Sequence, residues 1–204
     1  MARDLQSIVK MSRREGYALH PKAHKALVKR TAPPGGMNSG RPAQKSQYNI
    51  QLREKQKVKR LYGLLEKQFV NLMKEASKKQ GSTGELLLQF LEQRLDNALY
   101  KSGFSTSRRG ARQLVTHGHF MLNDRRVDIP SIRLKVGDKI VIRDSSKSNN
   151  YFKNLDDLSP PAGDIPSWLT VDRKKLQITV TGLPSREEAE PDINEQLIVE
   201  YYSR

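Results

Sequence analysis

Three arginines near the start of an expected helix are suited to binding phosphate. Arg108, Arg109 and Arg112 lie in the stretch STSRRGARQLVTHGHFMLNDRRV, which runs from Ser105 to Val127. A helix over Ser107–Thr116 would begin with free backbone amides and the positive end of its dipole, and both favour an anion. Guanidinium groups bind phosphate through paired hydrogen bonds. Arg108 and Arg112 share a face, and we expect both to be exposed. Taken alone, three basic residues are typical of a solvated helix face, so the choice depends on the charge around them.

The whole chain carries a large excess of positive charge. Its 204 residues include 37 Lys and Arg against 22 Asp and Glu, a net charge of +15. Residues 1–60 carry +12, residues 61–90 carry +1, residues 91–150 carry +6 and residues 151–204 carry −4. Two separate basic regions, the second with a basic turn at Arg125 and Arg126, indicate two contact zones on one polyanion. Nucleic acid is the favoured partner because phosphate contacts release counterions. An anionic membrane surface is the alternative, although no apolar run approaches the length of a membrane span.

Two short motifs resemble parts of enzymes. The segment KMSRR (Lys10–Arg14) resembles a loop of tRNA synthetases, but that loop follows a nucleotide-binding domain and only nine residues precede it here. The tripeptide RLD (Arg94–Asp96) resembles the catalytic aspartate motif of pseudouridine synthases, whose catalytic domain is larger than the segment that follows here. We expect Asp96 to lie inside a helix and to serve packing or a local salt bridge. The sequence shows no glycine-rich phosphate loop and no nucleophile triad, so we predict that the protein is not an enzyme.

The sequence offers little for a metal ion. It has no cysteine, which excludes disulfides, thiolate ligands and cysteine nucleophiles. His20 and His24 are spaced to share one helix face, but two histidines without further ligands make a poor structural zinc site. His117 and His119 flank a glycine, and we interpret them as turn residues or as residues that face RNA. We expect no metal and no other cofactor.

Apolar spacing and turn residues predict the elements that position these side chains. Helices are expected over Pro21–Arg30, Gln51–Arg60, Leu64–Ala76, Leu86–Leu99 and Ser107–Thr116, and at the C-terminus around Ile193–Tyr201. Ser105, Thr106 or Ser107 would cap the helix that carries the arginines. Short strands are expected at Phe120–Leu122 and Arg126–Ile129 around an Asn123-Asp124 turn, at Lys139–Arg143 and at Leu176–Val180. The polar stretch Ser145–Asn150 is interpreted as a boundary, and Thr31–Pro42 as a loop or extended arm.

The order of these elements resembles a known RNA-binding module. The stretch from Leu91 to Ile142 contains a helix with R-L-D, a glycine turn, a helix with A-R-Q-L-V, a short hairpin and a V-G-D turn. This order resembles the S-four RNA-binding module. SRREG at Ser12–Gly16, QLREKQKVKRLYG at Gln51–Gly63 and DINEQLIVEYYSR at the end of the chain resemble the bacterial S-four ribosomal protein family. The similarity covers nearly the full length.

The resemblance implies a fold, a function and partners. The fold is α+β, a helical domain with an inserted module of two helices packed on a small antiparallel sheet, and a basic N-terminal arm. The implied function is a primary binder of small-subunit (16S) rRNA in the cytoplasmic ribosome, which nucleates subunit assembly and influences translational accuracy. Neighbouring small-subunit proteins and mRNA near the path by which it enters are the further implied partners. A stand-alone RNA-binding factor with the same module is the alternative, and the long basic N-terminal region argues against it.

The resemblance also implies domain boundaries and contact residues. We expect a basic extension at 1–45, a helical domain at 46–90 completed by 185–204, and the module with its following strands at 91–184. RNA contacts are implied for Arg13, Arg14, Tyr48, Arg53, Lys55, Lys57, Lys59, Arg60, Arg108, Arg109, Arg112 and Gln113. Many relatives hold the N-terminal arm with a zinc site made of cysteines. Val9 and Ser12 stand where the first two would be, so local packing or RNA must order the arm.

Overall fold

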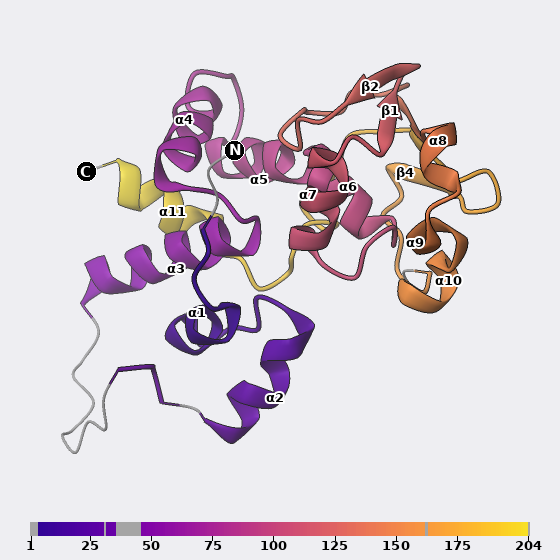
Figure 1. Cartoon of the computed structure of the whole chain (residues 1–204). Coiled ribbons are helices and arrows are strands. Elements are labelled where there is room, and N and C mark those ends of the chain that lie inside the picture. The colour runs from indigo at the N-terminus through magenta and orange to yellow at the C-terminus, as the bar shows by residue number, and fades with distance from the viewer. Residues whose placement is uncertain (1–3, 31, 36–45, 162, 204) are drawn as a thin grey trace. The chain divides into compact units, whose positions relative to one another are not determined.

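The chain forms two compact units in the computed structural model, which describes residues 4–30, 32–35, 46–161 and 163–203. Unit 1 comprises Met1–Leu87 and Asp192–Arg204, and unit 2 comprises Leu88–Pro191. Figure 1 shows the helices and strands of both. None of the helices in these described ranges is long and apolar enough to cross a membrane. Most of the Thr31–Pro42 stretch lies outside the described residues, so the interpretation of that stretch as an arm stays a prediction.

Unit 1 is helical. It contains α1 (Ile8–Glu15), α2 (Pro21–Lys29), α3 (Gln47–Leu61), α4 (Glu66–Ala76), the first part of α5 (Thr83–Glu92) and α11 (Glu195–Tyr202). The expected helices of this region are therefore present, and α3 begins four residues earlier than expected because Ser46 caps it. Val58, Phe69 and Ile198 are fully buried. The apolar face of α11 packs on α3, so the last helix of the chain completes the core that α3 and α4 begin (Figure 1).

The sequence pattern did not predict α1, although it forms the first packed layer of unit 1. Met11 and Ser12 are buried on its inner face. The Ser12 hydroxyl donates to the carbonyl oxygen of Ile8 at 2.8 Å and accepts from the amide of Leu19 at 3.2 Å. His20 caps α2 by accepting from the Lys22 amide at 3.0 Å. Local hydrogen bonds therefore join α1 to the segment that leads into α2.

The expected helix over Leu86–Leu99 breaks in two near the start of unit 2. That prediction was wrong, because α5 ends at Glu92 and α6 (Leu95–Lys101) begins after Arg94, whose backbone is extended. Arg94 forms an antiparallel bridge with Arg133. On either side, the Leu134 amide donates to Gln93 and the Leu95 amide donates to Ile132, both at 2.9 Å. These hydrogen bonds to a segment far along the chain satisfy backbone amides and carbonyls that are no longer paired within a helix.

A five-stranded antiparallel sheet supports the helices of unit 2. The strands are β1 (Phe120–Leu122), β2 (Arg125–Val127), β3 (Lys139–Ile142), β4 (Leu169–Asp172) and β5 (Gln177–Val180), in the order β2-β1-β3-β5-β4. Asn123 and Asp124 both have positive φ, as a tight two-residue hairpin between β1 and β2 requires. Phe120 pairs with Val127 on one side and with Ile142 on the other. Alternate residues such as Ile140, Ile142 and Ile178 are buried.

The two helices of the module, α6 and α7 (Arg108–Thr116), pack on this sheet as predicted. Leu95, Leu99, Ala111 and Val115 share one apolar core with the inner face of the strands. The observed architecture confirms the predicted α+β fold.

The polar stretch Ser145–Asn150 is not a boundary. It spans most of α8 (Asp144–Lys147) and the start of α9 (Asn150–Lys153). A further short helix, α10 (Leu155–Leu158), follows, and the sheet continues after it with β4 and β5. Phe152 and Leu155 are buried in the same core as the strands. These two apolar residues fix the segment to unit 2 although most of its neighbours are polar.

Candidate nucleic-acid interface

The start of α7 carries the arginines that the sequence singled out. Ser107 caps the helix, since its hydroxyl accepts from the Gly110 amide at 3.1 Å. Of the three expected caps, Ser107 is the one that the structure shows. Ser105 is buried beneath this turn and donates to the carbonyl oxygen of Ser107 at 3.1 Å. A Cβ on Gly110 would lie 2.5 Å from the Ser105 hydroxyl, so the close approach of turn and helix requires glycine here.

The expectation that Arg108 and Arg112 are exposed was wrong, because both side chains are only 12% exposed. Arg112 lies 3.5 Å from the Asp96 carboxylate. Asp96 also accepts two hydrogen bonds from Arg94, at 3.0 and 2.7 Å, and this pair is buried. The RLD tripeptide is therefore a structural ion pair. Its carboxylate is held by two guanidinium groups, so it is not placed to act as a base or a nucleophile.

The exposed polar face of α7 is formed by other residues. Arg109, Gln113 and Thr116 are exposed and follow one another at helical spacing, whereas Arg108 and Arg112 flank the buried Ala111 and Val115. The hairpin adds exposed Arg125 and Arg126. We refer to these exposed residues of unit 2, together with Lys139 of β3, as the module surface: Arg109, Gln113, Arg125, Arg126 and Lys139.

The Arg126 side chain can lie over the end of α7 because residue 118 is a glycine. Gly118 has φ +71, and a Cβ there would lie 2.7 Å from the Arg126 guanidinium. The absence of a side chain at Gly118 therefore lets the Arg126 guanidinium lie over the helix end.

The two histidines after α7 belong to a turn. The His119 ring nitrogen Nδ1 lies 3.0 Å from the hydroxyl of buried Ser146, and its ring contacts Phe152 edge to face. Burial lowers the pKa of His119, and the positive charges that His117 and Arg143 can carry lower it further. The ring is therefore neutral at physiological pH and serves packing, in agreement with one of the two interpretations drawn from sequence.

The cations of α3 are mostly paired within unit 1. Arg53 and Arg60 both contact Glu15 of α1, whose side chain is fully buried. Lys55 and Lys59 contact Glu66 of α4 at 2.7 and 2.8 Å. Lys57 pairs with Glu54 of the same helix at 2.8 Å. The helix that looks most basic in sequence is thus largely neutralised by carboxylates from three places in the chain.

Lys55 is the most deeply buried of the paired cations of α3. Its side chain is 4% exposed, and its ammonium lies 4.7 Å from the centre of the Tyr201 ring of α11. The Tyr202 hydroxyl donates to Glu66 at 3.0 Å, so Glu66 joins α3, α4 and α11. We therefore leave Lys55 out of the contact set proposed below. Burial alone would raise the pKa of Glu66, but the hydrogen bonds and charges of Lys55 and Lys59 outweigh it and lower the pKa to about 2.

Replacing Glu66 with glutamine is expected to change the pH dependence of the stability of unit 1. Because the folded-state pKa of Glu66 is about 2 and its ordinary value is 4.5, the carboxylate stabilises the fold above pH 4.5. This contribution is lost as the pH falls towards 2. Urea unfolding followed by circular dichroism should show Glu66→Gln less stable than the parent at neutral pH, with the difference shrinking in acid. A difference that stays constant across that range would contradict the assignment.

Sequence reasoning missed a second set of exposed cations in unit 1. Lys22, Lys25 and Lys29 of α2 are exposed, and their spacing places them on one face. The span from Gly16 to Arg53 contains no acidic residue, which is the signal that points to this helix. Of the other nominated residues, Arg14 is exposed, Arg13 donates to the Ala32 carbonyl oxygen at 2.8 Å, and Tyr48 is 48% exposed beside the Tyr201 ring.

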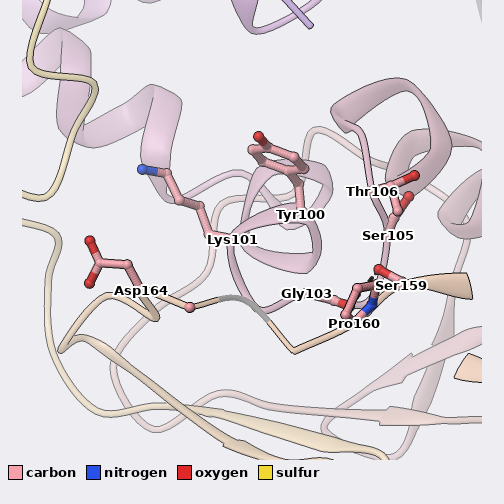
Figure 2. Close-up of a pocket in the computed structure, with 9 residues that line it drawn as sticks. Tyr100, Lys101, Gly103, Ser105, Thr106, Ser159, Pro160 and Asp164 are labelled. Atoms are coloured by element: carbon pink, nitrogen blue, oxygen red, sulfur yellow. Dashed lines mark hydrogen bonds between the residues drawn. The ribbon is translucent and has the colours of Figure 1, made fainter. Parts of the chain in front are cut away.

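A hollow of about 390 Å³ lies beside the start of α7, and Figure 2 shows its lining. The lining residues are Tyr100, Lys101, Gly103, Ser105, Thr106, Ser159, Pro160, Gly163 and Asp164. The hydroxyls of Ser105 and Ser159 donate to the main-chain carbonyl oxygens of Ser107 and Gly103. Both hydroxyl protons therefore point at main-chain carbonyl oxygens, and neither hydroxyl is paired with a base that could activate it as a nucleophile. Within the described ranges, no group of three or more His, Asp or Glu side chains is arranged to hold a metal ion.

Comparison with known proteins decides the family. The model of the family described as "Ribosomal protein S4/S9 N-terminal domain" matches residues 3–92, and that described as "S4 domain" matches residues 93–140. The small ribosomal subunit protein uS4 of Chloroflexus aurantiacus is 50% identical to this chain over the full length of both. The proteins of the same name from Chlorobium limicola and Syntrophomonas wolfei are 48% and 45% identical, again over the full length of both chains. This chain belongs to the uS4 family of ribosomal proteins. The resemblance expected from sequence is confirmed.

Family membership and structure agree on where the module begins. The two family matches meet between residues 92 and 93, and α5 ends at Glu92. The S4 domain match covers α6, α7, β1 and β2 and ends within β3. The KMSRR segment, the other enzyme-like motif, lies in α1 with Met11 and Ser12 buried, so it too serves packing.

Proposed function

We propose that this protein is a structural constituent of the small ribosomal subunit and a primary binder of 16S rRNA. Its full-length relatives are named small ribosomal subunit protein uS4. The observation that supports RNA binding most directly is the net charge of +15, much of it carried by exposed cations in both units. Phosphate contacts supply most of the affinity in such complexes. The protein acts by binding and shaping RNA, and no chemical step is part of the proposal.

The proposed contact set combines sequence and structure. In unit 2 it is the module surface, with Arg109 and Gln113 from the original prediction. In unit 1 it is Arg13, Arg14 and Tyr48, the exposed α2 lysines, and Arg53 of α3, whose side chain is 32% exposed. Lys57, Lys59 and Arg60 are 11–15% exposed and paired with carboxylates, as Arg108 and Arg112 are, so they stay outside the set. RNA of this kind is recognised by shape and phosphate position, so the affinity is shared among many of these residues.

The wider role follows from the same binding. By holding folded rRNA early, the protein nucleates assembly of the subunit in the cytoplasmic ribosome. It then influences translational accuracy from a position beside neighbouring small-subunit proteins and near the path by which mRNA enters. The domain division that goes with this role is a basic extension at 1–45, a helical domain at 46–90 completed by 185–204, and the RNA-binding module at 91–184.

Crosslinking in growing cells tests the proposal. Ultraviolet crosslinking followed by purification of the tagged full-length protein should recover small-subunit rRNA as the dominant RNA. Another small-subunit ribosomal protein carrying the same tag serves as a positive control, and a soluble acidic protein serves as a negative one. Recovery of mRNA, tRNA or no RNA in place of 16S rRNA would overturn the proposal.

A further inference from the structure

We infer that Arg108 is a positioning residue of the proposed rRNA interface, which fixes α7 so that Arg109 and Gln113 face the RNA. The inference rests on the proposed function. It differs from the pattern in the sequence, where Arg108 looks like the first phosphate ligand at a helix start. Three separate contacts within unit 2 support it.

The Arg108 guanidinium is used by the protein itself. Its Nε donates to the Asn97 amide oxygen at 2.8 Å, and its Nη2 donates to the Glu190 carboxylate at 2.7 Å. Its central carbon lies over the Tyr100 ring, 4.5 Å from the ring centre, which is a favourable cation–π distance. The side chain is 12% exposed. A phosphate would have to displace a carboxylate that already forms a charge-assisted hydrogen bond.

The partners of Arg108 are themselves held in place. Asn97 is buried and donates both to the carbonyl oxygen and to the carboxylate of Glu92, at 3.1 and 2.7 Å. The segment before Glu190 is fixed through Glu188, whose carboxylate accepts from the amides of Ser167 and Ser185. Ala189, between the two glutamates, is buried. Arg108 therefore ties the first residue of α7 to α6 and to a rigid acidic segment.

Because Arg108 fixes α7, it also determines the direction in which Arg109 and Gln113 point. Successive residues on a helix are rotated by about 100°. With Arg108 and Arg112 held inward by Glu190 and Asp96, Arg109 and Gln113 must lie on the adjacent face, which is exposed. Rotation or tilting of α7 would move both outward residues together, because they lie on consecutive turns of one helix. Arg108 thus sets the direction of a surface that it does not itself form.

Salt-dependent binding distinguishes a positioning residue from a phosphate ligand. Each phosphate contact contributes roughly 0.7–0.9 to the slope of log affinity against log salt concentration. The full-length parent and the variants Arg108→Ala, Arg109→Ala and Glu190→Gln are measured on 16S rRNA. Fluorescence of the single tryptophan, Trp168, which is buried in unit 2, confirms that each variant is folded before it is measured.

The expected results separate the two arginines. Arg109→Ala should lower the slope by roughly one contact. Arg108→Ala should weaken binding by roughly tenfold without changing the slope, because it misplaces contacts made by other residues. Glu190→Gln keeps the arginine but removes its charged partner, and it should also weaken binding at an unchanged slope.

Three outcomes would overturn the inference. One is a loss of slope in Arg108→Ala equal to that of Arg109→Ala, and another is an Arg108→Ala variant that binds as tightly as the parent. The third is a Glu190→Gln variant with tighter binding and a steeper slope, which would show that the carboxylate had been competing with phosphate for Arg108. If Arg108→Ala does not fold, the Glu190→Gln result alone decides. A parent protein without salt-dependent rRNA binding would instead contradict the proposed function.

Discussion

Replacement of Asp96 with alanine is expected to destabilise unit 2 by about 3–5 kcal/mol, the typical cost of leaving one member of a buried ion pair without its partner. Asp96 accepts both hydrogen bonds of the Arg94 fork, and both side chains are about 5% exposed. The Arg94 side chain is buried, and its backbone forms the pairing that separates α5 from α6. Arg112 loses its contact at the same time, so the change also loosens α7.

Urea unfolding followed by Trp168 fluorescence measures this effect, since that residue is buried in unit 2. Asp157→Ala is the matched control. It removes an exposed carboxylate from α10 and should change the free energy of unfolding by no more than about 0.5 kcal/mol. Asp96→Asn should lie between the control and Asp96→Ala, because it keeps one acceptor but loses the charge. An Asp96→Ala variant as stable as the control would refute the structural role of the RLD motif.

The second large effect is expected at Glu15, which fastens α1 to α3 in unit 1. Its side chain is fully buried and accepts from Arg53 and Arg60, while its second oxygen has no hydrogen-bond partner within the described part of the chain. Burial raises the pKa of Glu15, and the charges of Arg53, Arg60 and Arg14 oppose that rise. Glu15→Ala should destabilise unit 1 by about 2–3 kcal/mol, less than Asp96→Ala does in unit 2, because Arg53 is partly exposed and can turn to water.

Hydrogen exchange identifies where the Glu15 effect acts. In Glu15→Ala, the amides of α1, including that of Met11, and the Leu19 amide that donates to Ser12 should lose protection, while the buried strands of unit 2 keep theirs. Glu85→Gln serves as the control, since Glu85 is exposed on α5. Unchanged protection of α1 in the Glu15 variant would show that this carboxylate does not hold the N-terminal helices in place.

The Glu15 carboxylate also helps to explain how the N-terminal helices pack in a chain without cysteine. Ser12 supplies hydrogen bonds within the α1–α2 pair, and Glu15 supplies the link to α3. Neither was foreseen from sequence. A serine in a basic segment looks like an ordinary surface residue, and a glutamate is seldom buried unless an arginine from elsewhere in the chain meets it.

Local signals in the sequence were sufficient for most of unit 2. The Ser107 cap and the Asn123-Asp124 turn each depend on the conformation of a few neighbouring residues. The apolar spacing of α4 and α7 likewise indicated their buried faces. Features of this kind can be predicted from sequence because they depend on interactions between residues that are close together in the chain.

Features that depend on contacts between distant parts of the chain could not be predicted from the sequence. The break at Arg94 requires the segment around Arg133, and the pairing of the α3 cations requires Glu15 and Glu66. Strand β4 begins after buried Trp168 and pairs only with β5, so its short pattern carried little signal. The same reason made Arg108 and Arg112 appear exposed, because Asp96 and Glu190 lie 16 and 82 residues away along the chain.

The most direct test of cationic rRNA recognition is the salt dependence of binding between the full-length protein and 16S rRNA. We expect log affinity to fall linearly with log salt concentration, with a slope equivalent to several phosphate contacts at roughly 0.7–0.9 each. The slope should be shallower in a variant that replaces Arg109, Arg125 and Arg126 with alanine. Affinity that is independent of salt, or equal affinity for an unrelated RNA of the same length, would contradict the account.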